Sequence, residues 1–269
     1  MKKLFVLFFA LVAGFATAKA QNEEYANLTV VLAYEGDTDC TARYKAEQAC
    51  FTLYKNEDGK FCMAHVWPKS NVQSFGVVKF DDLDTYEETE SNYATTEYTF
   101  DWHYQNSVDG EVAVARCLLA KVYKPAEVVY VVTYNLPDGS NHLFQVALDG
   151  DVDEFFDDIE QEMLDGLLGT WVATDLDVYD DGGELMKSIS VAKENAELKV
   201  TFNDDATGVI NTLNNEEYST EEFTYYYDWP FIAVQRQTGS DLIFKFEEGK
   251  LSFKELDGLD VVMNFSKQE

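Results

Sequence analysis

The sequence predicts an all-β protein made of two antiparallel β domains joined by one short helix. Three observations lead to this fold class. Beyond residue 21, runs rich in Val, Phe, Tyr and Thr alternate with turn clusters at short intervals, as in antiparallel all-β proteins. A helical period is convincing in one segment, 153–165. The hydrophobic fraction of 46% is large enough to build cores in spite of a formal charge of −30.

The amino terminus has the layout of a secretory signal peptide. MKKLFVLFFALVAGFATAKA begins with two lysines, continues with an apolar run over 4–15 and ends with small residues at 18 and 20. This run is shorter than the roughly 20 apolar residues that cross a bilayer, and no later stretch is apolar enough. We therefore expect removal of residues 1–20, a mature chain that starts at Gln21, export to the periplasm or the extracellular space, and no membrane insertion.

The charge of the chain limits its partners. Removal of the signal peptide takes away three lysines and no acidic residue, which changes the formal charge from −30 to −33. A field of this sign repels the phosphates of nucleic acids and of anionic lipid head groups. We expect no nucleic-acid partner, and cations or basic proteins fit the charge better.

Residues 21–150 predict the first β domain, either a barrel or a sandwich. Turns are marked by NEDG, by VDG at 108–110 and by LPDGS at 136–140, where Pro and Gly supply the special backbone angles. A short helix over 42–48 lacks a good cap. The expected strands are 26–34, 49–55, 60–67, 74–80, 95–104, 111–123, 127–135 and 142–148.

All four cysteines lie in this first domain: Cys40, Cys50, Cys62 and Cys117. An even number in an oxidising compartment favours disulfides. The expected hairpin of 49–55 with 60–67 pairs Cys50 with residue 65 or 66, which places Cys62 beyond the Cα separation of about 7 Å that a disulfide spans. Cys40–Cys50 with Cys62–Cys117 is the preferred pairing. Free buried thiols are the alternative, because cysteine also serves as a small core residue.

Residues 151–166 predict an acidic linker helix. Phe156, Ile159 and Met163 fall at helical spacing and form one apolar stripe. Acidic residues crowd the first turns, where the helix dipole favours them, and Gly166 is a natural stop.

The same segment carries the ligand spacing of a calcium loop. In DGDVDEFFDDIE, positions one, three, five, nine and twelve of an EF-hand are occupied by Asp149, Asp151, Asp153, Asp157 and Glu160. Position six needs Gly for a sharp turn and is Glu154 here. The alternative is a helix start capped by Asp151 or Asp153, with further acids on an exposed face.

Residues 167–269 predict the second β domain. The alternation of Leu242, Phe244 and Phe246, repeated across the turn EEGK, is typical of strands with one apolar face, as in an up-and-down barrel or a sandwich. The number of runs, eight or nine, favours a barrel, and the expected form is a barrel of eight strands. The expected strands are 168–178, 185–192, 197–203, 208–214, 222–228, 231–236, 241–247, 250–255 and 260–265.

Residues from about 154 to 269 resemble the lipocalin-like domains of secreted bacterial proteins. The resemblance is carried by LLGTW at the exit of the helix, the hairpin LKVTFNDDATGVINTL, the aromatic strand FTYYYDW and the closing ladder LIFKFEEGKLSFKEL with VVMNF. It implies that Gly169 and Trp171 plug the closed end of an eight-stranded barrel. The Thr-Asp-Tyr trio of the family is absent, as is an arginine near the last strand to lie over the tryptophan. On strand rhythm, the first domain resembles calycin-like barrels.

The aromatic strand gives the candidate ligand site. Phe223, Tyr225, Tyr227 and Trp229 are expected on one strand face, where they would line a pocket for an apolar ligand. The alternative is core filling, because small barrels are often just wide enough to pack solid.

No reaction is predicted by the sequence. Asp101 and His103 share a strand face, but no serine or cysteine stands in a nucleophile context, and a Gly-rich phosphate loop is absent. We therefore expect no enzyme and no cofactor. The predicted function is an exported binding protein for a small apolar ligand or a protein partner. A calcium-binding acidic surface or scaffolding protein is the alternative.

Overall fold

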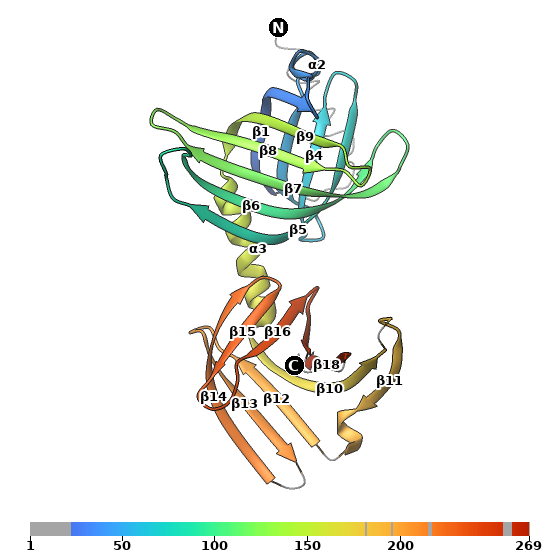
Figure 1. Cartoon of the computed structure of the whole chain (residues 1–269). Coiled ribbons are helices and arrows are strands. Elements are labelled where there is room, and N and C mark those ends of the chain that lie inside the picture. The colour runs from blue at the N-terminus through green and yellow to red at the C-terminus, as the bar shows by residue number, and fades with distance from the viewer. Residues whose placement is uncertain (1–22, 181, 195, 215–216, 255–259, 269) are drawn as a thin grey trace. The chain divides into compact units, whose positions relative to one another are not determined.

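The computed structural model describes residues 23–180, 182–194, 196–214, 217–254 and 260–268. The chain divides into two compact units, Met1–Ile159 and Glu160–Glu269. Each unit is a closed antiparallel barrel of eight strands, so the predicted all-β class with two β domains and one linking helix is confirmed (Figure 1). The predicted signal peptide, 1–20, lies outside the described residues.

The first unit is a barrel, and the predicted alternative of a sandwich is excluded. Neighbouring strands pair in chain order, and the ring closes where the first strand pairs with the last over Ala26–Glu35 and 142–150. A two-residue strand, β2 (Thr38–Asp39), adds to the edge of the first strand. The eight strands of the ring are β1 (Glu23–Glu35), β3 (Cys50–Lys55), β4 (Phe61–Trp67), β5 (Val72–Tyr86), β6 (Ala94–Asn106), β7 (Val112–Tyr123), β8 (Val128–Asn135) and β9 (Asn141–Gly150).

The interior of the first barrel is filled by side chains that alternate with outward ones along each strand. Phe51 and Leu53 of β3 are fully buried, as are Phe100 of β6 and Phe144 of β9. Several of these inner rings pack edge to face, the geometry that their quadrupoles favour. A dense aromatic core therefore occupies the space that a larger barrel would leave for a ligand.

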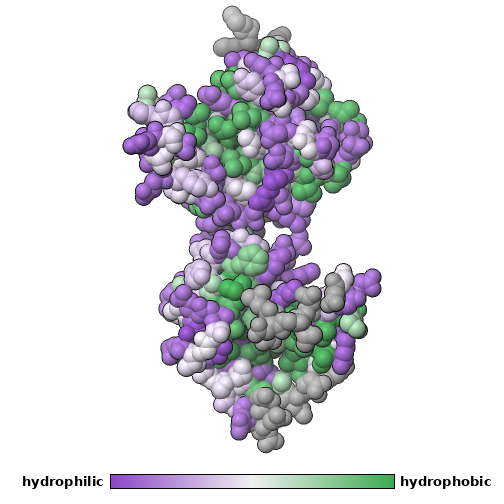
Figure 2. Space-filling model, viewed as in Figure 1, coloured by the Kyte–Doolittle hydropathy of each residue, from purple (hydrophilic) through white to green (hydrophobic). Residues whose placement is uncertain are grey.

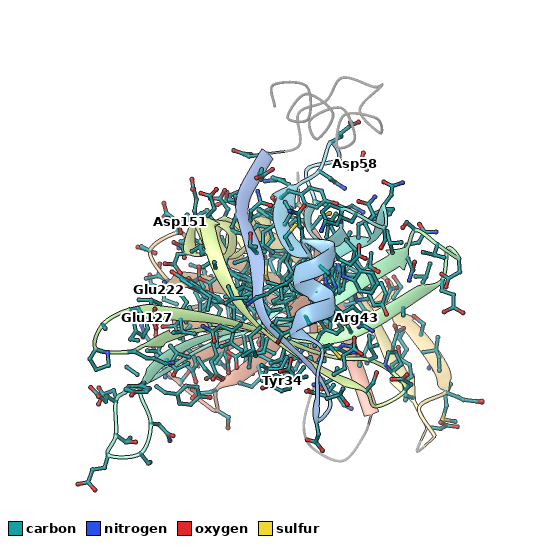
Figure 3. All side chains as sticks on the ribbon, turned by 90° about the horizontal axis from the view of Figure 1, so that it is seen from above. Tyr34, Arg43, Asp58, Glu127, Asp151 and Glu222 are labelled. Atoms are coloured by element: carbon teal, nitrogen blue, oxygen red, sulfur yellow. The ribbon has the colours of Figure 1, made fainter. Side chains whose placement is uncertain are left out.

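Helices cover both ends of this first barrel. At one end lies α2 (Thr41–Glu47), whose Tyr44 is 2% exposed and meets the ring of Phe144 at 5.1 Å (Figures 1 and 3). As the sequence suggested, the α2 N-terminus has no side-chain cap. At the other end, Phe155 and Phe156 of α3 (Val152–Leu167) are buried among the strand side chains.

The second unit repeats this strand order. Its ring closes between the first and last strands over Trp171–Tyr179 and 260–267, and β11 (Leu185–Ser190) pairs only with the second half of the first strand. A short 3-10 helix, η1 (Val191–Glu194), follows β11. The strands of the ring are β10 (Gly169–Tyr179), β12 (Ala196–Phe202), β13 (Thr207–Asn214), β14 (Glu217–Asp228), β15 (Phe231–Arg236), β16 (Leu242–Glu247), β17 (Lys250–Lys254) and β18 (Asp260–Lys267).

The two barrels share a further detail in their closing strands. β1 has a register shift between Val30 and Leu32 where it faces β9, and β10 has one between Ala173 and Asp175 where it faces β18. Bulges of this kind bend a strand and increase its twist, which helps a small sheet to close. The architecture is compatible with the lipocalin-like fold that the second domain resembles.

The predicted disulfide pairing is wrong, because all four cysteines are free. Cys62 lies beside Tyr54 on the outer face of the β3–β4 hairpin, whereas Cys117 lies between inward-facing residues of β7. Residues on opposite faces of a barrel wall cannot form a disulfide. The alternative of free thiols describes the structure.

Cys40 and Cys50 are also too far apart to pair. The backbone N–H of Cys40 donates to Ala33 O, while Cys50 pairs with Thr29, four residues away along β1. Four residues of a strand span about 13 Å, which exceeds the reach of a disulfide. The hairpin register that excluded Cys50–Cys62 is confirmed, since Cys50 lies opposite Val66.

The outer surface is mainly hydrophilic, with local exceptions. Figure 2 shows hydrophobic residues gathered over β7 and β8 of the first unit, where Leu118, Val122 and Val131 point outward. None of the described helices is long and apolar enough to cross a membrane.

Candidate ligand-binding site

One end of the second barrel, its base, is sealed around Trp171. The indole is 1% exposed, and its Nε1–H donates to Leu167 O at the end of α3, 2.7 Å away. The ring meets that of Phe246, with centroids 5.8 Å apart. Gly169 has φ +110°, a left-handed value that favours glycine, where the chain passes from α3 into β10. The two residues predicted to plug the barrel, Gly169 and Trp171, thus lie at its closed end.

Lys267 of β18 contributes to the base and was not predicted as part of it. Its Nζ lies 5.7 Å from the centroid of the Trp171 ring and donates to Gly166 O at 2.7 Å and Asp165 O at 3.3 Å. A cation is favoured both over an indole face and at a helix C-terminus. The family pattern predicts an arginine over the tryptophan, and a lysine takes its place. The strand register identifies Lys267 as part of the base, because Lys267 of β18 lies directly opposite Trp171 of β10.

The aromatic strand predicted to bind a ligand is β14, and it mostly fills the core. Phe223 and Tyr225 face inward, are 3% and 5% exposed, and both pack edge-on against Phe202. Trp229 is 6% exposed and stacks on the partly exposed Tyr227, with centroids 4.9 Å apart. The Nε1–H of Trp229 has no acceptor among the described residues. The core-filling alternative therefore describes Phe223 and Tyr225, and Phe223 lies opposite Arg236 in the register of β14 and β15.

The opposite end of the second barrel, its mouth, has an inner wall that is partly open to solvent. Inward residues near the base are almost fully buried, for example Val234 and Ile232 at 0%. Further from the base, several apolar inward side chains of other strands in the ring are partly exposed. These mouth residues include Leu176, Val178, Leu198, Leu242, Phe253 and Met263. The described inner wall is thus packed near the base and partly exposed, with several apolar side chains, at the mouth.

The mouth also contains an inward-facing ion pair that the sequence did not reveal. Arg236 follows the buried Val234 by two residues on β15, and Glu221 precedes the buried Phe223 by two on β14. The guanidinium donates from Nε and Nη2 to Glu221 Oε2 at 3.0 and 2.6 Å. Glu221 Oε1 accepts from the backbone N–H and the hydroxyl of Thr238 at 3.2 and 3.0 Å.

The Glu221 carboxylate is held ionised by its hydrogen bonds, and the ion pair is partly exposed. Hydrogen bonds from Arg236 hold the pKa of Glu221 below its usual value. The side chains of Arg236 and Glu221 are 29% and 20% exposed. An apolar wall with a few polar groups at fixed positions is the general composition of small-molecule sites.

The interior of the first barrel contains a buried histidine, His65. Trp67 Nε1–H donates to His65 Nε2 at 2.9 Å. Because an indole N–H only donates, His65 is neutral and carries its proton on Nδ1, which lies 3.5 Å from the Tyr134 hydroxyl. Burial lowers the pKa of His65 to about 3. The ring stacks on Phe51, with centroids 4.3 Å apart, so His65 serves as a satisfied core residue.

The acidic residues of the predicted calcium loop have other partners. The Asp151 carboxylate caps α3 by accepting the N–H groups of Asp153 and Glu154 at 2.9 and 3.2 Å. Asp153 accepts from the Tyr98 hydroxyl and Lys121 Nζ, both at 2.5 Å. The helix-cap alternative is therefore the one observed.

The other members of the predicted loop are spread over two elements. Asp149 pairs with Asn27 in the sheet, while Asp157 and Glu160 lie along α3. Within the described ranges, no group of three or more His, Cys, Asp and Glu side chains is arranged to hold a metal ion. The geometry thus gives no support to calcium binding by Asp149, Asp151, Asp153, Asp157 and Glu160.

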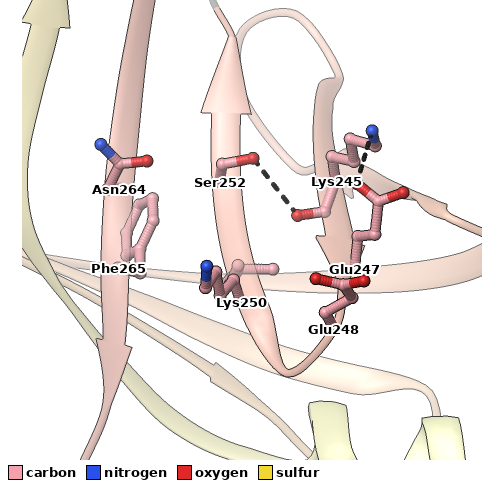
Figure 4. Close-up of a pocket in the computed structure, with 8 residues that line it drawn as sticks. Lys245, Glu247, Glu248, Lys250, Ser252, Asn264 and Phe265 are labelled. Atoms are coloured by element: carbon pink, nitrogen blue, oxygen red, sulfur yellow. Dashed lines mark hydrogen bonds and ion pairs between the residues drawn. The ribbon is translucent and has the colours of Figure 1, made fainter.

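A shallow groove of about 330 Å³ lies on the outside of the second barrel (Figure 4). It runs over the row formed by Lys245, Ser252 and Asn264 on β16, β17 and β18. Its polar groups bind one another or neighbouring residues: Lys245 pairs with Glu247 at 2.8 Å, and Asn264 donates to Asp177 at 2.7 Å. The groove therefore offers few free polar groups to a ligand.

Comparison with protein-family models, with curated proteins and with solved structures finds no match. The geometry of the two barrels is thus the basis for assigning a role to the chain.

Proposed function

We propose that this chain is an exported, non-catalytic binding protein that carries a small apolar ligand in the mouth of its second barrel. The observation that supports this is the contrast along the inner wall of that barrel. At the base, side chains such as Trp171 and Ile232 are buried and packed, whereas at the mouth apolar side chains such as Leu176 and Met263 are half-exposed. Apolar surface left open to water inside a concave wall gains free energy when a ligand covers it, about 25 cal/mol per Å².

The first barrel has a different role in this proposal. Its ends are covered by α2 and α3 and its interior is filled with aromatic rings. We assign to it a structural or partner-binding role, and the ligand goes to the second unit alone. Export rests on the signal-peptide layout of residues 1–20.

Native mass spectrometry of the protein purified from its own host tests the proposal. The expected result is a defined extra mass that disappears when organic solvent removes the ligand. Met263→Trp, which places a large ring in the mouth, should abolish the extra mass. Met186→Trp is the matched control, because Met186 of β11 is 70% exposed and a larger side chain there extends into solvent. Repeated absence of any extra mass, together with no uptake of a neutral apolar dye by the delipidated protein, would refute ligand carriage.

A further inference from the structure

The polar groups in the mouth of the second barrel differ in their remaining hydrogen-bonding capacity. Glu221 accepts four hydrogen bonds, two from Arg236 and two from Thr238. Four is about the number that a carboxylate can accept, so Glu221 is saturated. Arg236 has five N–H donors, and Glu221 takes one from Nε and one from Nη2. The other three N–H groups have no acceptor among the described residues.

The place of Arg236 leaves these donors within reach of a ligand. A Cβ built on Gly239 would lie 3.3 Å from Arg236 Nη1, so the bare glycine backbone passes directly over the guanidinium without covering it with a side chain. The Arg236 side chain is 29% exposed, and it follows Val234 on the inward face of β15. Leu242, the partner of Val234 on β16, belongs to the half-exposed apolar wall. A donor group and an apolar surface therefore meet at the mouth.

Two other charged side chains on the inward side of the second barrel lie at the edge of its mouth. Lys187 of β11 pairs with Val178, and Glu217 of β14 precedes Glu221 by four residues, so both share the inward side of their strands. Both are exposed to solvent. Exposed charges contribute little to binding energy, since water and salt screen them. Arg236 is thus the half-buried cation that a ligand in the mouth would meet.

From this asymmetry we infer that the ligand is an anionic amphiphile: an apolar chain that covers the half-exposed wall, and a carboxylate head group that accepts hydrogen bonds from Arg236. The inference rests on the proposed function and specifies the ligand class for the same site. An ammonium head group would need an acceptor, and Glu221 has none to spare. The negative charge of the whole chain disfavours anions at long range, but salt screens that field, and the contact with Arg236 acts at hydrogen-bond distance. A carboxylate matches the planar N–H fork of a guanidinium, and such charge-assisted bonds are roughly twice as strong as neutral ones.

The inference is tested with four ligands of one chain length. Dodecanoic acid, methyl dodecanoate, dodecanol and dodecylamine compete with a neutral environment-sensitive dye for the delipidated mature chain at pH 8 and constant ionic strength. The acid is expected to bind at least about ten-fold more tightly than the alcohol and the ester, a difference of about 1.4 kcal/mol. The amine is expected to bind more weakly than the alcohol.

Two variants assign the preference to the ion pair. Arg236→Gln should reduce the preference for acid over alcohol to less than about two-fold while the alcohol still binds. The double variant with Glu221→Gln and Arg236→Gln removes both charges together and keeps the test valid if the single variant does not fold. Lys245→Gln is the matched control, because it removes a positive charge from the outer face of the neighbouring strand β16, and it should keep the preference.

The outcomes separate the two proposals. Equal binding of acid and alcohol, or a preference that survives in the folded double variant, would overturn the anionic ligand class and leave apolar ligand binding intact. Failure of all four amphiphiles and of the dye to bind would overturn ligand carriage itself, and the ligand class with it.

Discussion

The packing of α3 into the first barrel gives a quantitative prediction for Phe156. The ring is 1% exposed and stacks on Tyr98 with centroids 4.2 Å apart and an angle of 7° between planes. It also contacts the rings of Phe80, Phe100 and Phe155, with centroids 5.2–5.7 Å away. Phe156→Ala removes all of these contacts and leaves a cavity under the helix.

The expected loss follows from burial and from the ring contacts. Truncation of a fully buried Phe to Ala costs about 3–5 kcal/mol, which includes the cavity left behind. Aromatic pairs add about 0.5–1.5 kcal/mol beyond the buried area, and Phe156 makes four ring contacts, so the upper part of that range applies. Such a loss is a large fraction of the stability of a domain of this size.

Because the chain folds as two units, the assay must report the stability of each unit separately. Hydrogen exchange with mass spectrometry, followed against guanidinium concentration, reports the unfolding free energy separately for peptides of each unit. Peptides of β5 and β6 should lose about 4–5 kcal/mol of protection free energy in Phe156→Ala. Tyr86→Ala is the control in the same unit, because Tyr86 is 49% exposed and its truncation should change stability by less than about 0.5 kcal/mol. A loss below about 1 kcal/mol for Phe156→Ala would show that α3 does not close the barrel.

Three further predictions test other parts of the structure. Burial lowers the pKa of His65 to about 3 from an ordinary value of 6.5, so the unfolded state binds one more proton between these two values. The first unit should therefore lose up to about 1.4 kcal/mol of unfolding free energy per pH unit as the pH falls from 6.5 towards 3. His65→Gln, which keeps an acceptor for Trp67, should flatten this slope in pH-dependent unfolding curves. An unchanged slope would contradict a buried neutral His65. Lys267→Met should lower the unfolding free energy of the second unit by about 1 kcal/mol, because it removes the cation over Trp171 and at the end of α3. Lys267→Arg keeps a cation there and should retain most of that stability. Equal stability of the two variants would argue against this contact. Alkylation without reductant should add four labels to each unfolded chain. In the folded state, the buried Cys62 and Cys117 should be protected from the reagent. Recovery of disulfide-linked peptides would contradict the free thiols.

Strand positions were largely predictable because alternation and turn residues are local signals. The predicted strands 231–236 and 250–255 differ from β15 and β17 by at most one residue. The main error concerns β5, which was predicted to end at residue 80 and extends to Tyr86. Its last residues are FDDLDTY, an acidic run typical of a turn, yet they pair with β6 as far as Tyr86 opposite Thr95. Backbone hydrogen bonds to a neighbouring strand override local propensity there.

The candidate site was less predictable, because it depends on contacts between distant parts of the chain. Trp171 could be predicted as a plug from a short motif. Lys267 lies 96 positions further along the chain and reaches Trp171 only because β18 closes the ring against β10. Likewise, Arg236 and Glu221 are 15 residues apart on separate strands, and only the β14–β15 register shows that both point inward.

The sequence by itself determined the all-β class, the two units, the linking helix and its acidic cap, since each follows from periodicity and residue type within a short window. Only the tertiary structure decided which barrel has its ends covered by helices and which has a partly exposed inner wall, and whether a given cysteine, histidine or arginine faces the core. The physical reason is that a strand presents both faces equally in its sequence, and the closure of the ring determines which face becomes the inside.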